Sequence, residues 1–323
     1  MNTQRTMASL SLDMDDKWCY LKIHGDPGWE ALPTYLPTFV PRVLGFLQSL
    51  NDLHITFMIV GQDADREQNH PLLQSLVAAG HEIGNHSYNH ESWMHLYHED
   101  QIVDDLVKAE VAIERATRQR PVGFRGPGFS ISYNIMQVLA QRGYLYDAST
   151  FPTYLGPLAR AYYFMTTTLT PEEKAMRREL FGKFKDGLRT NAPYRWRYNG
   201  SDLIEIPVTT FPIFKVPIHI SYVLYLSLFS KTLALTYFRT ALKLCKLSGL
   251  EPSILLHPLD FLGVDDNQNE LSFFPAMGLK ADRKMGVVRE ALRIMADEFD
   301  LVTMQEHALH FAQASTFPIL GLR

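Results

Sequence analysis

Short apolar runs with the character of β-strands alternate with longer stretches of helical periodicity along most of this 323-residue chain. In the helical stretches, such as 35–50, 101–117 and 282–299, apolar residues recur every three or four positions. Strands that alternate with helices predict a parallel sheet, either covered on both faces or closed into a barrel. The sequence therefore predicts an α/β fold. The expected strands are 8–12, 55–60, 82–85, 122–124, 203–206, 253–256 and 301–303.

Length and composition are those of a single globular domain. Hydrophobic residues make up 46% of the chain and charged residues 20%, which leaves enough apolar side chains for a core. A chain of 323 residues is long for one domain, but single α/β barrels reach this length. We therefore expect one barrel domain over residues 1–323. Within it, residues 154–200 carry helix-forming charges and aromatic residues but no clear strand, which predicts a helical insertion, or cap, over one end of the barrel.

Two features of the sequence bear on where the protein works. The first residues are polar and lead directly into a strand-like run, which does not match a secretory signal. Cys19 and Cys245 lack the spacing of a metal or redox motif and are typical of reduced structural thiols. We therefore expect a cytoplasmic protein. The formal net charge of −4 gives no reason to expect nucleic-acid binding.

The charge is unevenly distributed along the chain. Residues 174–246 contain 13 Lys and Arg against four acidic residues, a net charge of +9, which leaves −13 for the rest of the chain. Such a segment predicts an anionic partner, although a solvated helical surface explains the same charges. Residues 216–229 carry no Asp, Glu, Lys or Arg, and they are too few for a membrane-spanning helix of ~20 residues. They form either a buried core helix or an interfacial element that docks on anionic lipid.

Two histidines four positions apart, His86 and His90, follow the expected strand 82–85, and Asp13 and Asp15 follow the expected strand 8–12. The spacing brings the histidines to one side of a helical turn or of a tight strand-to-helix junction. A carboxylate from a separate strand end would complete an Asp-His-His set. Catalytic zinc sites use three protein ligands and keep one position open for water. The pair therefore predicts a catalytic metal site.

Two more polar residues follow expected strands. Arg125 comes after 122–124 and His257 comes after 253–256. Taken alone, Arg125 fits a surface salt bridge and His257 fits a histidine at the barrel rim. A buried apolar strand that ends in a single Arg or His is nevertheless unusual unless that group has a partner. Because catalytic residues of such folds gather at the carboxyl ends of the strands, the combined set favours an active site there.

Four motifs, taken together and in order, resemble those of the polysaccharide deacetylases, the NodB-homology enzymes of carbohydrate esterase family 4. They are Ser-Leu-Asp-Met-Asp at 11–15, His-Ser-Tyr-Asn-His at 86–90, Phe-Arg-Gly-Pro-Gly-Phe-Ser at 124–130 and Leu-Leu-His-Pro at 255–258. The resemblance implies a distorted (β/α) barrel, one divalent metal held by Asp-His-His, and hydrolysis of N-acyl or related amide groups.

The chain departs from the family pattern at two places. One residue separates the two acids of the first motif, as in the Asp-x-Asp branch that includes peptidoglycan-deacetylase-like proteins and cyclic-amide hydrolases. The Asp-x-x-x-Trp motif is absent, and Asp147-Ala-Ser-Thr and Glu205-Ile-Pro stand in comparable places. In these enzymes a catalytic acid protonates the departing nitrogen. The second departure leaves open which residue adjusts the pKa of that acid.

The resemblance implies a role for each candidate residue. Asp15, His86 and His90 would hold the metal, most simply Zn²⁺, although other first-row metals accept nitrogen and oxygen ligands. Asp13 would act as the base that takes a proton from water, because it points to the same side of the strand edge as Asp15.

Two further roles complete the expected catalytic set. Arg125 would pair with Asp13 and keep it ionised. His257, on the opposite wall, would protonate the departing nitrogen. The histidines outside the motifs, including His219, are expected to be structural.

Three functions agree with this site. The first is a metal-dependent hydrolase that removes an N-acyl group, acetyl or formyl, from an amino sugar that is soluble or lipid-linked at the cytoplasmic face of the membrane. The second is a cyclic-amide or ureide hydrolase that uses the same metal site. The third is an inactive barrel that serves as a binding protein, and the intact set of site residues weighs against it. Anionic lipid or a lipid-linked sugar remains a candidate partner.

Overall fold

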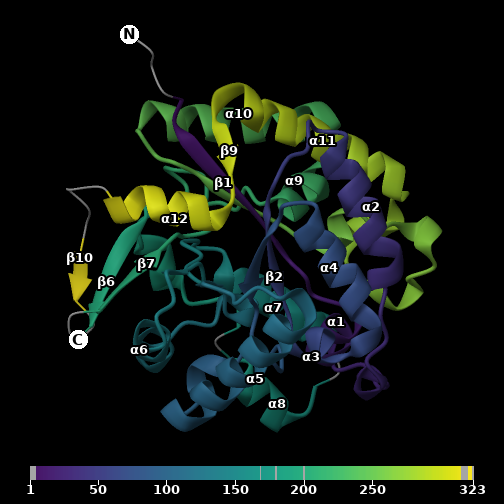
Figure 1. The fold of residues 1–323 in the computed structure, drawn as a ribbon. Coiled ribbons are helices and arrows are strands. Elements are labelled where there is room, and N and C mark those ends of the chain that lie inside the picture. Colours follow the sequence, from purple (N-terminus) through teal and green to yellow (C-terminus); the bar gives the residue numbers. More distant parts are fainter. Residues whose placement is uncertain (1–4, 168, 179, 199–200, 314–318, 322–323) are drawn as a thin grey trace.

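The computed structural model describes residues 5–313 and 319–321, apart from 168, 179 and 199–200. A curled sheet runs through the centre of the molecule, in the order β10-β6-β7-β5-β4-β3-β2-β1-β8, and β9 pairs with β1 (Figure 1). Neighbouring strands are parallel except for β6 and β7, which form an antiparallel pair. The strands are β1 (Met7–Asp13), β2 (Thr56–Ile59), β3 (Glu82–Asn85), β4 (Gly123–Phe124), β5 (Tyr146–Asp147), β6 (Tyr194–Tyr198), β7 (Ser201–Glu205), β8 (Ser253–Leu256), β9 (Asp300–Val302) and β10 (Ile319–Gly321).

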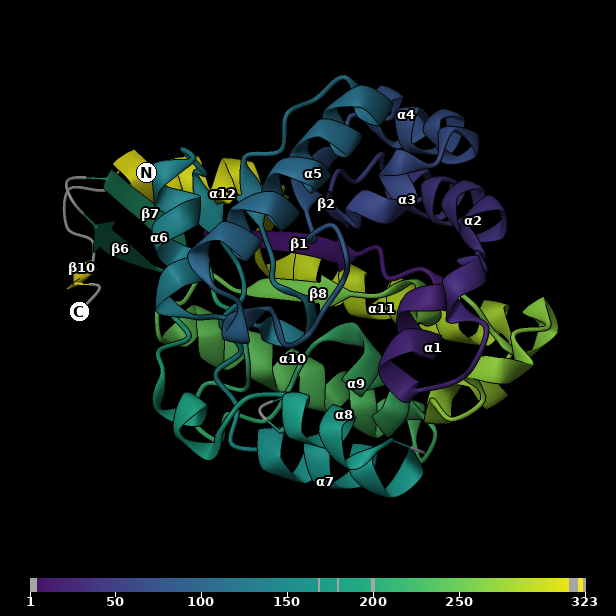
Figure 2. The same ribbon diagram turned by 90° about the horizontal axis from the view of Figure 1, so that it is seen from below.

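Helices surround this sheet, as the two perpendicular views show (Figures 1 and 2). The largest cluster of buried apolar side chains lies between β1, β2 and β8 and the helices α2, α9, α10 and α11. The helices are α1 (Lys17–His24), α2 (Leu36–Gln48), α3 (Gly61–Asp65), α4 (His70–Ala78), α5 (Glu99–Thr117), α6 (Tyr133–Gln141), α7 (Gly156–Thr166), α8 (Pro171–Met176), α9 (Ile220–Ser227), α10 (Lys231–Leu247), α11 (Ala281–Glu298) and α12 (Met304–Gln313).

The curled sheet brings the chain just beyond β7 next to the edge strand β8. The backbone N–H of Thr209 donates to the carbonyl of Ser253 on β8 at 2.9 Å, and the Ser253 N–H donates to the Thr209 hydroxyl at 2.8 Å. These two bonds link the chain after β7 to β8, on the far side of β1. The result is a curled, half-closed barrel, and the predicted α/β barrel class is confirmed.

Most of the expected elements are present. The apolar positions of α5 at Ile102, Leu106, Ala109 and Ile113 are buried, as the helical periodicity predicts. Strands β3 and β8 have the expected bounds, and β1, β2, β4, β7 and β9 differ from expectation by one or two residues at their ends. The short strands β5, β6 and β10 were not expected. Strand β5 has two residues, too few for an alternating pattern to be recognised.

The cap at 154–200 contains helices α7 and α8 and a short 3₁₀-helix, η5 (Phe184–Leu188), but it also contains strand β6. The expectation that no strand lies there was therefore wrong. The run Tyr-Arg-Trp-Arg-Tyr alternates with period two, so Tyr194 is buried and Trp196 is half-buried. On the other face, Arg195 and Arg197 form ion pairs with Asp202 of β7 at 3.2 and 2.8 Å. The bounds of the cap as a unit remain a prediction.

The cap contacts the barrel through specific polar groups. Tyr163 of α7 donates a hydrogen bond to the carbonyl of Ile23, and Arg177 donates to the carbonyl of Lys22 at 3.2 Å. The Arg177 guanidinium also lies 5.0 Å from the ring centre of Trp93, and its side chain is buried. These contacts fix the cap against the C-terminal turn of α1 and the loop that follows β3.

Two fully buried carboxyl groups face each other in the sheet, Asp147 on β5 and Glu205 on β7. Burial raises the pKa of both groups, and the neighbouring Asp147 raises that of Glu205 further, well above its usual range. The hydrogen bond between them lowers the pKa of Asp147 and raises that of Glu205. The proton of this pair therefore resides on Glu205, whose carboxyl group donates a hydrogen bond to Asp147.

We predict that Glu205→Gln makes the protein's stability less sensitive to alkaline pH. A carboxyl group whose pKa is raised by folding stabilises the protein below its unfolded pKa, about 4.3, and this contribution is lost as pH rises through the folded value. The free energy of unfolding, measured by urea denaturation between about pH 5 and 9, should fall more steeply for the natural protein than for the variant. Asp202→Asn is the control, because its pKa is lowered by Arg197 and not raised. Equal slopes for the natural protein and Glu205→Gln would contradict this placement of the proton.

Candidate active site

The first strand ends at the site and leads into a helix within a few residues. Strand β1 ends at Asp13, and the Met14 N–H still donates to the carbonyl of Met58 on β2 at 2.9 Å. The side chain of Asp16 then caps helix α1 by accepting from the Lys17 N–H at 2.7 Å. The hydroxyl of Tyr35 donates to the carbonyl of Asp15. The junction therefore holds Asp13 and Asp15 at the carboxyl end of the central strand.

His86 and His90 lie in a tight loop after β3, and the structure forms no helical turn between them. The loop turns because Ser87 and His90 adopt left-handed backbone conformations, with φ of 62° and 52°. The Asn85 side chain accepts from the Ser87 N–H at 2.8 Å, and two further backbone N–H groups of the loop donate to Asp105 at 2.8 and 3.1 Å. These bonds fix the loop and place both imidazoles on one side of it.

The structure brings the three expected metal ligands together. Asp15 Oδ1 lies 3.2 Å from His86 Nε2 and 2.8 Å from His90 Nε2. One ligand atom from each residue lies within 4.8 Å of the others, and all three side chains are buried. Two imidazole nitrogens and one carboxylate oxygen form a donor set that suits zinc and other first-row metals.

The hydrogen bonds behind these ligands orient them for a cation. His86 Nδ1 lies 2.7 Å from the carbonyl of Arg125, so Nδ1 carries a proton and Nε2 is the nitrogen that faces Asp15. Burial would raise the pKa of Asp15, but the charges and hydrogen bonds of His90 and His86 hold it well below its usual range. Asp15 is therefore ionised, as a metal ligand must be.

The two histidines differ in their titration. Burial lowers the pKa of His90 below its usual value, whereas for His86 the charges of Asp13 and Asp15 outweigh burial and raise it. His90 is therefore neutral at neutral pH. His86 would have to release a proton to coordinate, and a divalent cation promotes that release.

Asp13 and Arg125 form a buried ion pair beside the metal ligands. Arg125 Nη1 donates to Asp13 Oδ1 at 2.6 Å and to the Ser11 hydroxyl at 2.9 Å, and Arg125 Nε donates to the carbonyl of Ala148 at 3.0 Å. The Arg125 side chain is fully buried. The other carboxylate oxygen of Asp13 lies 3.9 Å from His86 Nε2, so Asp13 faces the metal ligands.

His257 continues β8 beside the end of β1. Leu256 pairs with Leu12 in the sheet, so His257 and Asp13 are the next residues of two neighbouring strands. His257 Nδ1 lies 3.1 Å from the hydroxyl of Ser221 on α9. All six residues expected from the motifs therefore lie at the carboxyl ends of adjoining strands; their catalytic and metal-binding roles remain predictions.

Sequence reasoning missed three residues near His257. The His219 ring, which was expected to be structural, lies 6.2 Å from the His257 ring between centroids, and burial together with the His257 charge lowers its pKa to about 3. Ser221 and Asp260 form a hydrogen-bonded chain with His257. The spacing of Asp260 three positions after His257, typical of a capping box, was the available signal.

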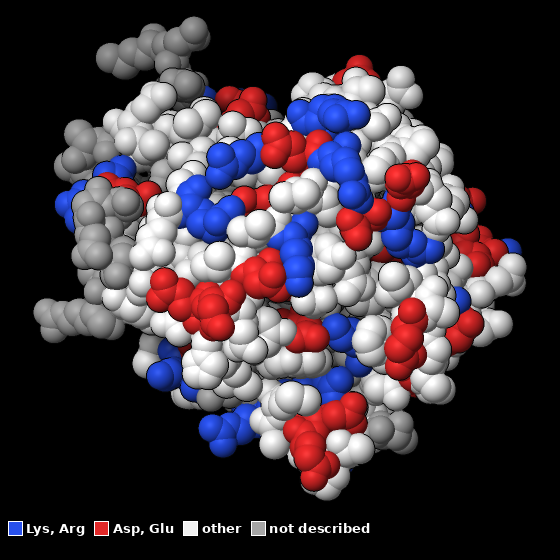
Figure 3. Space-filling model, turned by 60° about the horizontal axis from the view of Figure 1, so that its bottom comes forward, with Lys and Arg blue, Asp and Glu red and all other residues white. Residues whose placement is uncertain are grey.

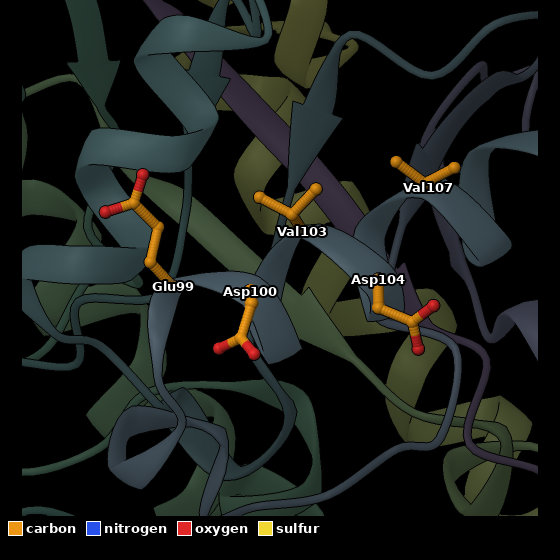
Figure 4. Close-up of a pocket in the computed structure, with 5 residues that line it drawn as sticks. All are labelled: Glu99, Asp100, Val103, Asp104 and Val107. Carbon is orange, nitrogen blue, oxygen red and sulfur yellow. The ribbon is translucent and has the colours of Figure 1, made fainter.

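A surface depression over helix α5 is separate from this site (Figure 4). Its side chains all come from this one helix, and none of them belongs to the Asp-His-His cluster. Asp104 in this depression forms an exposed ion pair with Lys108. The depression is therefore part of the solvated surface of α5. It is lined by Glu99, Asp100, Val103, Asp104 and Val107.

Comparison with known proteins supports the assignment made from the motifs. Residues 13–146 match the family model described as polysaccharide deacetylase, and this stretch contains Asp13, Asp15, His86, His90 and Arg125. The resemblance to the NodB-homology, family 4 deacetylases is thereby confirmed over residues 13–146.

Curated relatives match parts of the chain. A peptidoglycan-N-acetylglucosamine deacetylase of Bacillus cereus is 30% identical over 112 residues, which cover 33% of this chain and 48% of that protein. A peptidoglycan deacetylase-like protein of Gibberella zeae is 38% identical over 76 residues, which cover 24% of this chain and 22% of that protein. The chain thus spans less than half the length of these curated relatives.

Solved structures show the same fold over nearly the whole chain. A Mycobacterium smegmatis protein assigned to the polysaccharide deacetylases has a TM-score of 0.64 at 20% identity, covering 98% of this chain and 94% of that one. An allantoinase named PuuE has a TM-score of 0.60 at 16% identity, covering 98% and 93%. At these identities the likeness shows a shared barrel fold.

We predict that the purified protein binds about one divalent ion per chain, as a three-ligand site does, and that His86→Ala and His90→Ala each lose it. Elemental analysis by mass spectrometry measures the metal. Because metal that binds only the folded state stabilises it, a chelator should also lower the melting temperature of the natural protein. His310→Ala, a partly exposed histidine outside the cluster, is the control and should keep the ion. Full metal occupancy in the His86/His90 double variant would rule out this site.

Proposed function

We propose that the protein is a metal-dependent hydrolase that removes an N-acyl group from an amino sugar. The observation that carries the proposal is the buried Asp13–Arg125 pair directly beside the Asp-His-His cluster, inside the region that matches the deacetylase family. The relatives that match in sequence are named for deacetylation of peptidoglycan N-acetylglucosamine, which supports an acetylated amino sugar as the substrate class.

The residues divide the chemistry of amide hydrolysis among them. Asp15, His86 and His90 would hold one divalent ion, which would lower the pKa of water toward ~7 and polarise the amide oxygen. Asp13 would take a proton from water, and Arg125 fixes the orientation of its carboxylate by donating to Oδ1 at 2.6 Å. His257 donates a proton to the departing nitrogen. Amines are poor leaving groups without that proton.

A cyclic-amide hydrolase is the second candidate. The similarity in fold to an allantoinase supports it, because the same barrel can hold a site for ring opening. That likeness is one of fold, at 16% identity, whereas the peptidoglycan deacetylase of B. cereus also matches in sequence, at 30%. The amino-sugar reaction is therefore the better supported of the two. The third candidate, an inactive barrel, is less well supported, because the Asp-His-His cluster and the adjacent Asp13–Arg125 pair are all present.

We expect the metal-loaded protein to release acetate from soluble N-acetylglucosamine oligomers or peptidoglycan fragments, measured by an enzyme-coupled acetate assay. Asp13→Asn should keep its metal and lose turnover by ~10²–10⁴-fold, the usual contribution of a general base. Asp104→Asn, on the exposed face of α5, is the matched control and should retain activity.

Parallel assays distinguish the candidates. Ring opening of allantoin without acetate release would favour the cyclic-amide hydrolase. A loss of metal in Asp13→Asn, with metal retained in Asp15→Asn, would show that the two aspartates have the opposite roles. No turnover of any of these amides by metal-loaded protein would contradict the proposed function.

We further propose that the cap contacts an anionic lipid surface at the cytoplasmic face of the membrane, where the substrate would be lipid-linked. Leu158, Tyr162 and Met165 recur at helical spacing on α7 and are 67%, 55% and 83% exposed. Phe184 and Leu188 of η5 are also exposed, at 65% and 76%. A group of exposed apolar side chains such as this one can insert into the headgroup region of a lipid membrane.

Basic side chains on the same cap match the charge of such a surface. We define the cap cations as Lys174, Arg178, Lys183 and Lys185, whose side chains are all exposed. Arg177, in contrast, is buried beneath the cap, and Arg195 and Arg197 pair with Asp202, so the basic segment as a whole is not an open positive surface.

Two other findings restrict how the protein can meet a membrane. In the view of Figure 3, basic and acidic side chains are interspersed over the surface, so binding would depend on local groups of the cap. In the described part of the chain, no helix has both the length and the apolar character needed to cross a membrane. The uncharged run 216–229 contributes helix α9, whose Ile220, Val223 and Leu224 are buried in the core.

We expect the protein to bind vesicles that contain anionic phospholipid at low salt and to leave them as salt rises, because each surface Lys or Arg contributes ~1 kcal/mol and is screened by ions. Replacing Arg178, Lys183 and Lys185 by Gln should weaken this binding in a vesicle co-sedimentation assay. The matched control replaces three cations elsewhere, Lys280, Arg283 and Arg293 on and before α11, and should bind normally. A protein that ignores these vesicles at low salt would favour a soluble substrate.

A further inference from the structure

We propose that Asp260, acting through the hydroxyl of Ser221, is the positioning residue that sets the tautomer and the acidity of His257. This inference rests on the proposed function, because it assigns a role in amide hydrolysis to His257. The three groups come from different elements, His257 and Asp260 from the loop after β8 and Ser221 from the first turn of α9.

The direction of each hydrogen bond follows from the distances and the number of protons. The Ser221 hydroxyl lies 2.7 Å from Asp260 Oδ1 and 3.1 Å from His257 Nδ1. A serine hydroxyl has one proton and two lone pairs, whereas a carboxylate can only accept. The shorter, charge-assisted bond therefore takes the hydroxyl proton to Asp260, and the serine oxygen accepts the N–H of His257 Nδ1.

This arrangement leaves His257 Nε2 available for the substrate. With the Nδ1 proton fixed by Ser221, a second proton can only reside on Nε2, and that is the proton a general acid donates. Asp260 is held rigidly for this purpose, because its second oxygen accepts the backbone N–H of His257 at 2.8 Å and its side chain is 1% exposed. The negative charge of Asp260 stabilises the doubly protonated ring.

The two residues that stand in place of the absent Asp-x-x-x-Trp motif are engaged elsewhere. Glu205 accepts from the Thr150 N–H at 2.9 Å and from Trp196 Nε1 at 3.1 Å, and Asp147 accepts from Ser149. Among the described residues, neither carboxyl group has a hydrogen bond to His257. The Ser221–Asp260 pair is thus the carboxylate connection that the structure provides for this histidine.

Other charged and titratable groups surround the pair and bear on its pH dependence. His219, before α9, lies 6.2 Å from the His257 ring and is neutral because burial lowers its pKa. Lys284 of α11 donates to the carbonyls of Leu259 and Leu262, and its charge opposes the rise in the Asp260 pKa that burial causes. Burial raises the pKa of the Tyr20 phenol on α1, and the charges of Asp15 and Asp260 raise it further. Asp13 is the last residue of β1, and β1 pairs with β8, the strand that His257 follows.

The proposal predicts a change in the pH profile as well as in the rate. A general acid works only while it is protonated, so its pKa sets the alkaline limb of the kcat profile. Without the carboxylate, the doubly protonated ring loses a stabilising negative charge, so the alkaline limb should move to lower pH. We expect Ser221→Ala and Asp260→Asn each to lower kcat by about 10-fold, less than the ~10²–10⁴-fold that a general acid contributes. The double variant should lose little more, because the two residues act as one unit.

A second measurement does not depend on activity. Nitrogen-15 spectra of the histidine side chains should show the His257 proton on Nδ1 in the natural protein and a shift toward Nε2 in both variants. Ser227→Ala is the matched control, since Ser227 is a buried serine of the same helix whose hydroxyl donates to Leu224. It should leave the pH profile and the tautomer unchanged.

The outcomes separate this inference from the proposed function. A natural protein that hydrolyses none of the amides but carries the Nδ1 proton on His257 would contradict the function and support the Ser221–Asp260 connection. An active protein whose alkaline limb and tautomer are the same in the natural form, in Ser221→Ala and in Asp260→Asn would overturn the inference and leave the function standing. Metal content should be equal in all of these proteins, because the pair lies apart from the metal ligands.

Discussion

The buried Arg125 side chain is the interaction on which the site depends. It joins three parts of the barrel, because it donates to Asp13 and Ser11 on β1 and to the carbonyl of Ala148 after β5. Its own carbonyl accepts from His86 and so fixes the tautomer of a metal ligand. Removing one partner of such a buried pair typically costs ~3–5 kcal/mol, because the other charge is left unpaired. Arg125 therefore stabilises the fold of this edge.

The sheet converts distant sequence positions into one site. Parallel strands end at the same edge, so β1, β3, β4 and β8 deliver Asp13, His86, Arg125 and His257 to neighbouring positions. The left-handed residues after β3 then turn His90 back beside His86. Most of the precision of the site thus comes from regular strand pairing, and a short irregular loop supplies the rest.

The sequence was sufficient to predict the strands at this edge and the six polar residues that follow them, because apolar runs ending in a single polar residue are a local signal. It was not sufficient for contacts that depend on tertiary packing. The role of Ser221 depends on how α9 lies against β8, which no local pattern encodes. Arg177 is one of the basic residues of segment 174–246, for which the sequence predicted an exposed charged surface. In the structure it packs against Trp93 and is buried. Strand β6 was missed because its aromatic and basic residues do not form an apolar run like those of the other strands.

Chemically identical side chains near the site acquire different properties from their neighbours. Asp15 lies between two imidazoles, which hold its pKa low and suit it to bind a cation. The adjacent Asp16 points away and caps α1, and burial raises its pKa to about 6. Asp63, also buried, accepts from Trp18 at 2.9 Å, and burial together with the charge of Asp16 raises its pKa well above the usual range. Of these three carboxylates, only Asp15 belongs to the Asp-His-His cluster that could hold a metal ion.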